Sequence, residues 1–277
     1  MGMQINTNTA ANNAYRNLSN TQNALSKSLE KLSSGLRINR AADDAAGLAI
    51  SEGLRAQVNG SKVAARNAQD GISVIQTTEG ALTEVHSILQ RVRDLAVQAG
   101  NDSNNDDSRA AIKTESDALA SELTRIGAAT NFNGIKLLDG SATALTFQVG
   151  AGGIAAEDQI SISLAGANTT TVATAVSALT FATSANAATS IVAIDAQITA
   201  ISTARADLGA VQNRFESTIN SLNVSAENLA AAESRIRDTD MASEMVNYTR
   251  ANILSQAGTA MLAQANQSNQ GVLKLLG

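Results

Sequence analysis

The chain has 277 residues and a formal net charge of −5, and 44% of its residues are hydrophobic although only 2% are aromatic. This acidic balance gives no general reason to expect a nucleic-acid partner, and an aliphatic core suits close helix packing better than a deep ligand pocket. Because the sequence contains no Cys and no Pro, it excludes disulfides, thiolate metal sites and proline kinks in long helices.

The N-terminal segment lacks the marks of a secretory signal peptide. Residues 1–15 are polar and uncharged, without the basic start and the apolar run that such peptides need. No stretch approaches the roughly 18 consecutive apolar residues that are typical of a membrane span. We therefore expect either a soluble chain or one that is exported by a dedicated machine.

A first helix is predicted from about Thr9 to Ser33. It should end at Ser34-Gly35, because glycine readily adopts the left-handed conformation that closes a helix. Its apolar residues recur at helical spacing, which predicts a stripe that needs a partner. They are Leu18, Leu25, Leu29, Leu32 and Leu36.

A second, very long helix is predicted from Asp43-Asp44 to about Ala99, since carboxylates there can accept hydrogen bonds from the free amides of a first turn. Its glycines have two interpretations that the sequence leaves open. In the first, each glycine costs the helix about 1 kcal/mol relative to alanine and favours a local break. In the second, each glycine allows a neighbouring backbone to approach closely. These glycines are Gly47, Gly53, Gly60, Gly71 and Gly80.

The segment 100–108 is rich in Asn, Asp and Ser and predicts a tight reversal. The next helix, about Ser108–Ala129, should then pack antiparallel on the preceding one as a helical hairpin. Alternating apolar residues around Phe147 and Ile162 predict a β-hairpin over about 143–165. The Ala-, Thr- and Ser-rich stretch at about 166–189 has weak periodicity and is interpreted as a surface insert or loose linker.

The last third of the chain predicts two more helices. The first, about Ser190–Ile236, carries a coiled-coil seam of apolar residues at steps of three and four. The second follows a capping cluster at 238–240 and ends in an apolar tail that needs a partner. We expect its assembly contacts at Ile253, Leu262, Val272, Leu273, Leu275 and Leu276.

Together these elements predict a mainly α fold. It is an elongated antiparallel bundle of long coiled-coil helices formed by both chain ends, with a small β-hairpin region and no large outer domain. The two ends of the chain should meet in space, because neither can bury its apolar stripe alone.

Nothing in the sequence predicts catalysis, a cofactor or a metal site. His86 is the single histidine, so a triad or a zinc site would lack partners, and Asp43-Asp44 is explained by helix capping. Gly150–Gly153 lacks the Lys and Ser/Thr of a phosphate loop. Residues 1–40 carry five bases and one acid. Because no stacking aromatics are interleaved with them, this charge favours solvated helix faces and contacts between subunits over nucleic-acid binding.

Several segments resemble bacterial flagellins. Residues 32–39 read LSSGLRIN and are followed by DDAAG, while 76–82 read QTTEGAL and 89–98 read LQRVRDLAVQ. Near the other end, 208–215 read LGAVQNRF and 262–267 read LAQANQ. The match extends in order over about 4–150 and 190–277, so the resemblance is to a short flagellin with a minimal variable region.

The resemblance implies a structural, non-enzymatic subunit that self-assembles into the helical flagellar filament for swimming. Residues 1–44 and 238–277 would form the inner, axial domain and 45–237 the outer rod. Export would use the flagellar type III system without a cleaved signal, and the location would be extracellular. Implied partners are many copies of the chain, an export chaperone, cap and hook-associated proteins, and no membrane or nucleic acid.

The resemblance also implies an innate-receptor contact. Four residues match positions that contact the Toll-like receptor for flagellin in animal hosts, namely Gln90, Arg91, Leu95 and Glu115. A purely structural ion pair between Arg91 and Glu115 explains two of them equally well. Two other functions stay open, a hook-filament junction protein and a type III secreted translocator or effector. The segment 208–215 and the apolar tail favour the filament subunit.

Overall fold

The computed structural model describes residues 7–276, with side chains described as far as Gln267. The chain divides into two compact units. One, the terminal unit, joins residues 1–56 to residues 228–277, and the other, the central unit, comprises residues 57–227. The boundary falls at 56 and 228, where the resemblance placed it at 44 and 238.

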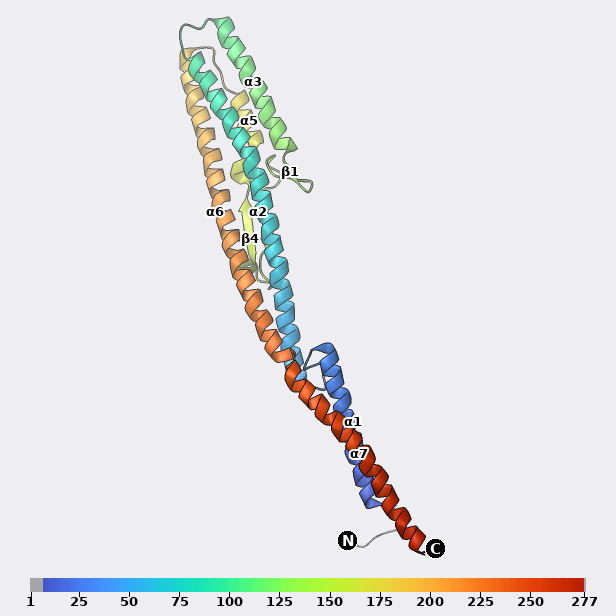
Figure 1. Ribbon diagram of the computed structural model, residues 1–277. Helices are drawn as coiled ribbons and strands as arrows, with labels where there is room; N and C mark the ends of the chain where they lie inside the picture. Colours follow the sequence, from blue (N-terminus) through green and yellow to red (C-terminus); the bar gives the residue numbers. More distant parts are fainter. Residues whose placement is uncertain (1–6, 277) are drawn as a thin grey trace. The chain divides into compact units, whose positions relative to one another are not determined.

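In the terminal unit, the two ends of the chain meet as expected. Helix α1 (Thr9–Ser34) runs beside α7 (Met241–Leu276) in Figure 1. Gly35 closes α1 in the left-handed conformation with a φ of 72°, and its amide donates to the carbonyl of Lys31. The predicted end of the first helix is therefore confirmed, with Gly35 as the capping residue that was expected.

The two aspartates before the second helix have different roles. Asp44 caps helix α2 (Ala45–Ala99), because its Oδ1 accepts from the Gly47 amide at 2.9 Å. The carboxylate of Asp43 instead accepts from the amides of Arg40 and Asn39, and these hydrogen bonds lower the pKa of Asp43. The carboxylate pair thus shapes the connection between α1 and α2.

In the central unit, α2 packs with α3 (Asp106–Ala129) and α6 (Ser184–Arg237). Figure 1 shows α2 and α6 side by side, with α3 beyond α2. The side chain of Asn105 caps α3 and completes the predicted helical hairpin. Along α6 the expected seam is confirmed at steps of seven, because four residues are buried at that spacing: Ile194, Ile201, Leu208 and Phe215.

The glycines of α2 do not break the helix, which continues from Ala45 to Ala99. At Gly71, an added Cβ would lie 2.8 Å from Cζ of Phe215, and at Gly60 it would lie 2.7 Å from Cβ of Ala151. Close approach therefore explains these two positions. Gly53 and Gly80 have open space around them, so close packing within the chain does not account for them.

Two antiparallel hairpins lie in the central unit. The predicted one pairs β3 (Ala144–Gln148) with β4 (Gln159–Ser163), and the short helix α4 (Ala155–Asp158) lies in their connection. The second pairs β1 (Asn131–Phe132) with β2 (Ile135–Lys136) and was not predicted. Its turn residues Asn133 and Gly134 have φ values of 49° and 82°, as an Asn-Gly hairpin turn requires.

The interpretation of residues 166–189 as a surface insert or loose linker is wrong. The segment holds the 3-10 helix η1 (Ala165–Ala167), helix α5 (Thr169–Ser177) and the first turns of α6. Helix α5 packs against α3, and the segment adds buried side chains to the core: Val172, Ala173, Val176, Leu179 and Phe181. Its small residues weaken the periodicity without preventing burial.

Helix α6 contains an 18-residue window with a mean hydropathy of 1.2, of which 28% is buried. By length and composition alone, it is the one described helix that would suit a membrane span. Two of its residues, Ile194 and Ile201, are buried in the core.

Candidate assembly surface

The contact between α1 and α7 is thin. Leu18 and Ser28 are the buried residues of α1, and Ala251 is the buried residue in the described part of α7. The side chain of Leu18 lies against Gly258. A Cβ added at Gly258 would be 3.2 Å from Cδ1 of Leu18. The side-chain amide of Asn8 donates to the carbonyl of Ala265 at 2.9 Å. Little apolar surface is therefore buried between these two long helices.

The expected assembly residues divide into four groups. Leu18 is buried against α7, whereas Leu29 and Ile253 are 55% and 61% exposed. The half-buried group comprises Leu25, Leu32, Leu36 and Leu262. The tail residues Val272, Leu273, Leu275 and Leu276 lie in the last turns of α7, where the side chains are outside the described residues.

Helix α7 carries large apolar side chains that the described residues leave exposed. Six large hydrophobic side chains of α7 are exposed: Met241, Met245, Val246, Ile253, Leu254 and Met261. Four of these line a groove of about 470 Å³, completed by Thr249 and Arg250. We call these six exposed residues the α7 stripe. A helix that packs on α1 and still exposes six large apolar side chains needs a further partner to bury them.

The ends of the two terminal segments are also hydrogen-bonded to each other within the terminal unit. The Arg37 amide donates to the Arg237 carbonyl at 2.6 Å, and the Thr239 amide donates to the Gly35 carbonyl at 3.0 Å. The Arg237 guanidinium pairs with Glu52 at 2.7 Å. These backbone bonds fix the register between the end of α1 and the end of α6.

The matched receptor positions do not all share one surface. Gln90, Arg91 and Glu115 are exposed on α2 and α3, and the Arg91 guanidinium donates to Oε1 of Glu115 through two nitrogens, at 2.6 and 2.9 Å. Leu95 is only 2% exposed and belongs to the hydrophobic core. Its side chain therefore stabilises the packing of α2 and is not part of the exposed patch.

His86 lies one turn before this patch on α2. Its Nε2 is 2.9 Å from Nε2 of Gln90, and its Nδ1 is buried without a hydrogen-bond partner among the described residues. This arrangement agrees with the expectation that the histidine lies on a helix face. Within residues 7–276, no group of three or more His, Cys, Asp or Glu residues is placed to hold a metal ion.

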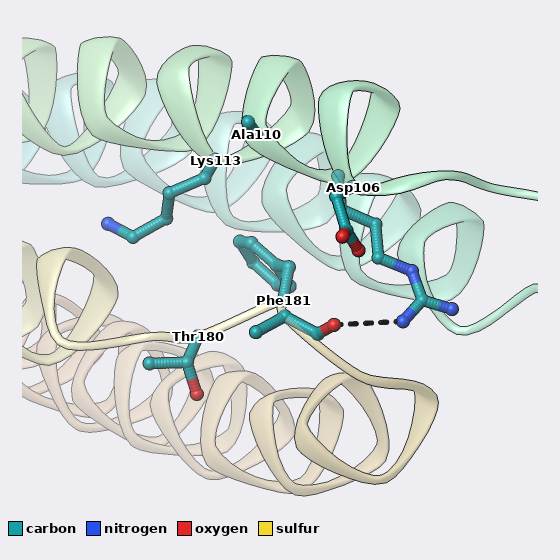
Figure 2. Close-up of a pocket in the computed structure, with 7 residues that line it drawn as sticks. Asp106, Ala110, Lys113, Thr180 and Phe181 are labelled. Carbon is teal, nitrogen blue, oxygen red and sulfur yellow. Dashed lines mark hydrogen bonds between the residues drawn. The ribbon is translucent and has the colours of Figure 1, made fainter.

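A hollow of about 320 Å³ lies between the start of α3 and the segment 180–182. Figure 2 shows Phe181 on its floor, with Asp106 and Lys113 on the α3 side. The Arg109 guanidinium donates to the Ala182 carbonyl at 3.0 Å, and the Lys113 amine donates to the Ser177 carbonyl at 3.1 Å. The cations of this hollow are therefore engaged in holding the segment after α5 against α3.

The assembly residues expected from the sequence include few members of the α7 stripe. Of its six members only Ile253 was expected as an assembly residue, because one apolar periodicity was traced along the last helix. The signal that could have found the others is a second set of apolar residues at Val246 and Leu254, each seven residues before another apolar residue.

Comparison with known proteins identifies the family of the chain. The model for the bacterial flagellin N-terminal helical region matches residues 5–143, and the model for the C-terminal helical region matches residues 191–276. Between them the two matches leave residues 144–190 unmatched, the segment from β3 to the first turns of α6. They include both helices of the terminal unit and the α2–α3 hairpin.

Full-length relatives agree with these matches. The chain is 53% identical to a flagellin of Halalkalibacterium halodurans and 51% identical to a flagellin of Bacillus subtilis, over 99% of this chain and 100% of each relative. A solved structure from Vibrio parahaemolyticus, described as a flagellar hook-associated protein, has a TM-score of 0.56 at 14% identity and covers 71% of this chain and 100% of its own. That likeness concerns the fold alone. The two flagellin family models, which together span most of the sequence, establish that the chain belongs to the bacterial flagellin family.

Proposed function

We propose that the chain is the structural subunit of a flagellar filament and that it polymerises through α1 and α7. The observation that carries this proposal is the α7 stripe, six exposed large hydrophobic residues on a helix that already packs against α1. Burying one such side chain contributes about 1.5–3 kcal/mol, and a polymer repeats the gain in every copy. A second copy of the chain is therefore the partner that the terminal unit requires.

The test is seeded polymerisation of the purified full-length chain, followed by electron microscopy. Long tubes are expected, because each added copy covers the stripes of its neighbours. Discrete particles in place of tubes would favour the junction protein, and lysis of added liposomes would favour a translocator. Either outcome refutes the filament proposal.

The same proposal assigns positions and partners within the filament. Residues 1–44 and 238–277 would lie in the inner, axial domain and residues 45–237 in the outer rod. The chain would leave the cell through the flagellar type III system and meet an export chaperone, cap and hook-associated proteins. The proposal gives the chain a structural role and no catalytic one, in keeping with a family of filament proteins.

A first prediction concerns the free monomer. Because α1 and α7 bury so few side chains against each other, their contact should not recover the conformational entropy of ordering both helices. Limited proteolysis of the monomer should remove both ends and leave a core near residues 45–237, while filaments resist. If monomer and filament resist equally, the terminal helices are stable before assembly and the prediction is wrong.

A second prediction concerns the exposed patch of Gln90, Arg91 and Glu115, which we propose as a contact for the host Toll-like receptor. Arg91→Ala should weaken receptor signalling by the monomer but leave its helix content nearly unchanged, since an exposed ion pair contributes about 0–1 kcal/mol. A reporter assay for the receptor and circular dichroism measure the two effects.

The matched control for this variant is Arg125→Ala, which removes an equally exposed arginine that pairs with Glu122 on α3. It should signal like the parent protein. Signalling that is unchanged in Arg91→Ala would remove Arg91 from the receptor contact.

A further inference from the structure

A second groove lies between α1 and α7, on the basic side of the terminal unit, with a volume of about 500 Å³. Lys27 and Lys31 line it from α1, and Arg250 lines it from α7. Ser28 and Ala251 form part of its lining and are both buried, so the floor of the groove consists of small side chains. It continues into the groove of the α7 stripe, because Arg250 and Leu254 line both.

The cations of this groove have no close anionic partner in the described part of the chain. No hydrogen bond and no ion pair within 4.0 Å engages the side chains of Lys27, Lys31 or Arg250 there. Glu244 is the one acid in the lining. The carboxylate of Asp43 interacts electrostatically with Lys27 and Lys31, but its hydrogen bonds come from backbone amides. The groove thus carries an excess of positive charge.

The charges of the two units are opposite. The terminal unit contains 10 Lys and Arg against 8 Asp and Glu, a net charge of +2, whereas the central unit contains 10 against 17, a net charge of −7. Several acids of the central unit are exposed without an ion pair among the described residues, including Asp70, Glu84 and Asp207. A second copy of the chain therefore offers the anionic surface that the groove lacks.

We propose that the groove bounded by Lys27, Lys31 and Arg250 binds an acidic helix face of a second copy of this chain. This inference rests on the proposed polymerisation and specifies the chemistry of one of its contacts. The part of α1 that lines the groove extends from Asn20 to Lys31, a length of about 16 Å or three helical turns. Small residues on the floor admit the partner helix closely, and the long cationic side chains at the rim reach its carboxylates.

The first test removes the charge of two groove lysines and uses a control with the same spacing. In K27Q/K31Q, the protein concentration at which half of the seeded protein sediments should rise by about tenfold, because two intermolecular attractions are lost in every contact. The assembly of this variant should also depend less on salt than that of the parent protein. In the control K62Q/R66Q, two exposed cations four residues apart on α2 are removed, and assembly should be unchanged.

Equal assembly of the groove variant and the control variant would overturn the inference and leave the filament proposal intact. Failure of the parent protein to polymerise under any condition refutes the filament proposal itself. Circular dichroism of each monomer shows whether the variants fold.

The second test uses the unmodified sequence. Filaments are grown from an equal mixture of ¹⁴N- and ¹⁵N-labelled chains and treated with a carbodiimide, which joins a lysine amine to a touching carboxylate as an amide with loss of water. Mass spectrometry should find Lys27 or Lys31 joined to an Asp or Glu of a differently labelled copy. Cross-links of these lysines only to carboxylates of their own chain, such as Asp43, or to none, would contradict the inference.

Discussion

Replacing Val246 and Ile253 together with aspartate should abolish polymerisation. Both side chains belong to the α7 stripe and are 58% and 61% exposed, so the substitutions cost the monomer little. In the filament each replaced side chain forfeits about 1.5–3 kcal/mol of burial, and an unpaired carboxylate in a contact between copies adds its desolvation cost. Sedimentation after seeding should show no polymer, while circular dichroism of the monomer stays close to that of the parent protein.

The matched control places the same substitutions on α6. Val192 and Val224 are 70% and 58% exposed, and they lie outside the terminal helices. Their replacement with aspartate should reduce polymerisation less than replacement of the α7 pair. A normal filament yield from the α7 variant, or an equal loss in both variants, would show that the stripe does not carry the assembly contact.

Phe215→Ala should destabilise the central unit by about 3–5 kcal/mol, the usual cost of removing a fully buried aromatic ring. Phe215 is 0% exposed, lies edge-on to Phe147 with ring centroids 5.8 Å apart, and fills the space beside Gly71. Urea unfolding followed by circular dichroism measures the free energy of unfolding.

Two further variants make this prediction specific. Phe132→Ala removes a half-buried ring from the short β1–β2 hairpin and should cost clearly less. Gly71→Ala should also destabilise, since its Cβ would overlap the Phe215 ring, and should cost less in a Phe215→Leu background. If Phe215→Ala lowers the free energy of unfolding by less than about 1 kcal/mol, the surrounding residues collapse into the cavity and the prediction is wrong.

The long helices could be predicted from the sequence because their ends carry specific chemistry. Gly35 supplies the left-handed residue that ends α1, and Asp44 supplies the oxygen that begins α2. The seam of α6 was equally clear, since Ile194 and Phe215 belong to a run of buried residues at steps of seven. Local periodicity and capping are sufficient for such elements.

The elements that could not be predicted depend on tertiary contacts. Helix α5 has nine residues, and apart from Val172 and Val176 they are all Thr, Ala or Ser, so its burial against α3 leaves only a short apolar pattern in the sequence. The role of Gly71 follows only from the position of Phe215, which lies more than a hundred residues further along the chain.

The burial of the candidate assembly residues could not be predicted from the sequence. The stripe of α1 was visible as leucines at helical spacing, but only the packing of α7 shows that Leu18 faces inward and Leu29 faces solvent. In the same way, Leu95 matches a receptor position by resemblance, whereas its burial in the core follows from the fold. Which apolar side chains of a helix become buried depends on the element that packs against it, and the sequence of the helix alone does not show this.

The most direct measurement is a reconstruction of the assembled filament by electron cryomicroscopy at a resolution that shows side chains. We expect α1 and α7 to lie between copies, with Met245, Val246 and Ile253 covered by a neighbouring chain. A filament in which these side chains face solvent or an open channel, with copies joined through other surfaces, would contradict this expectation.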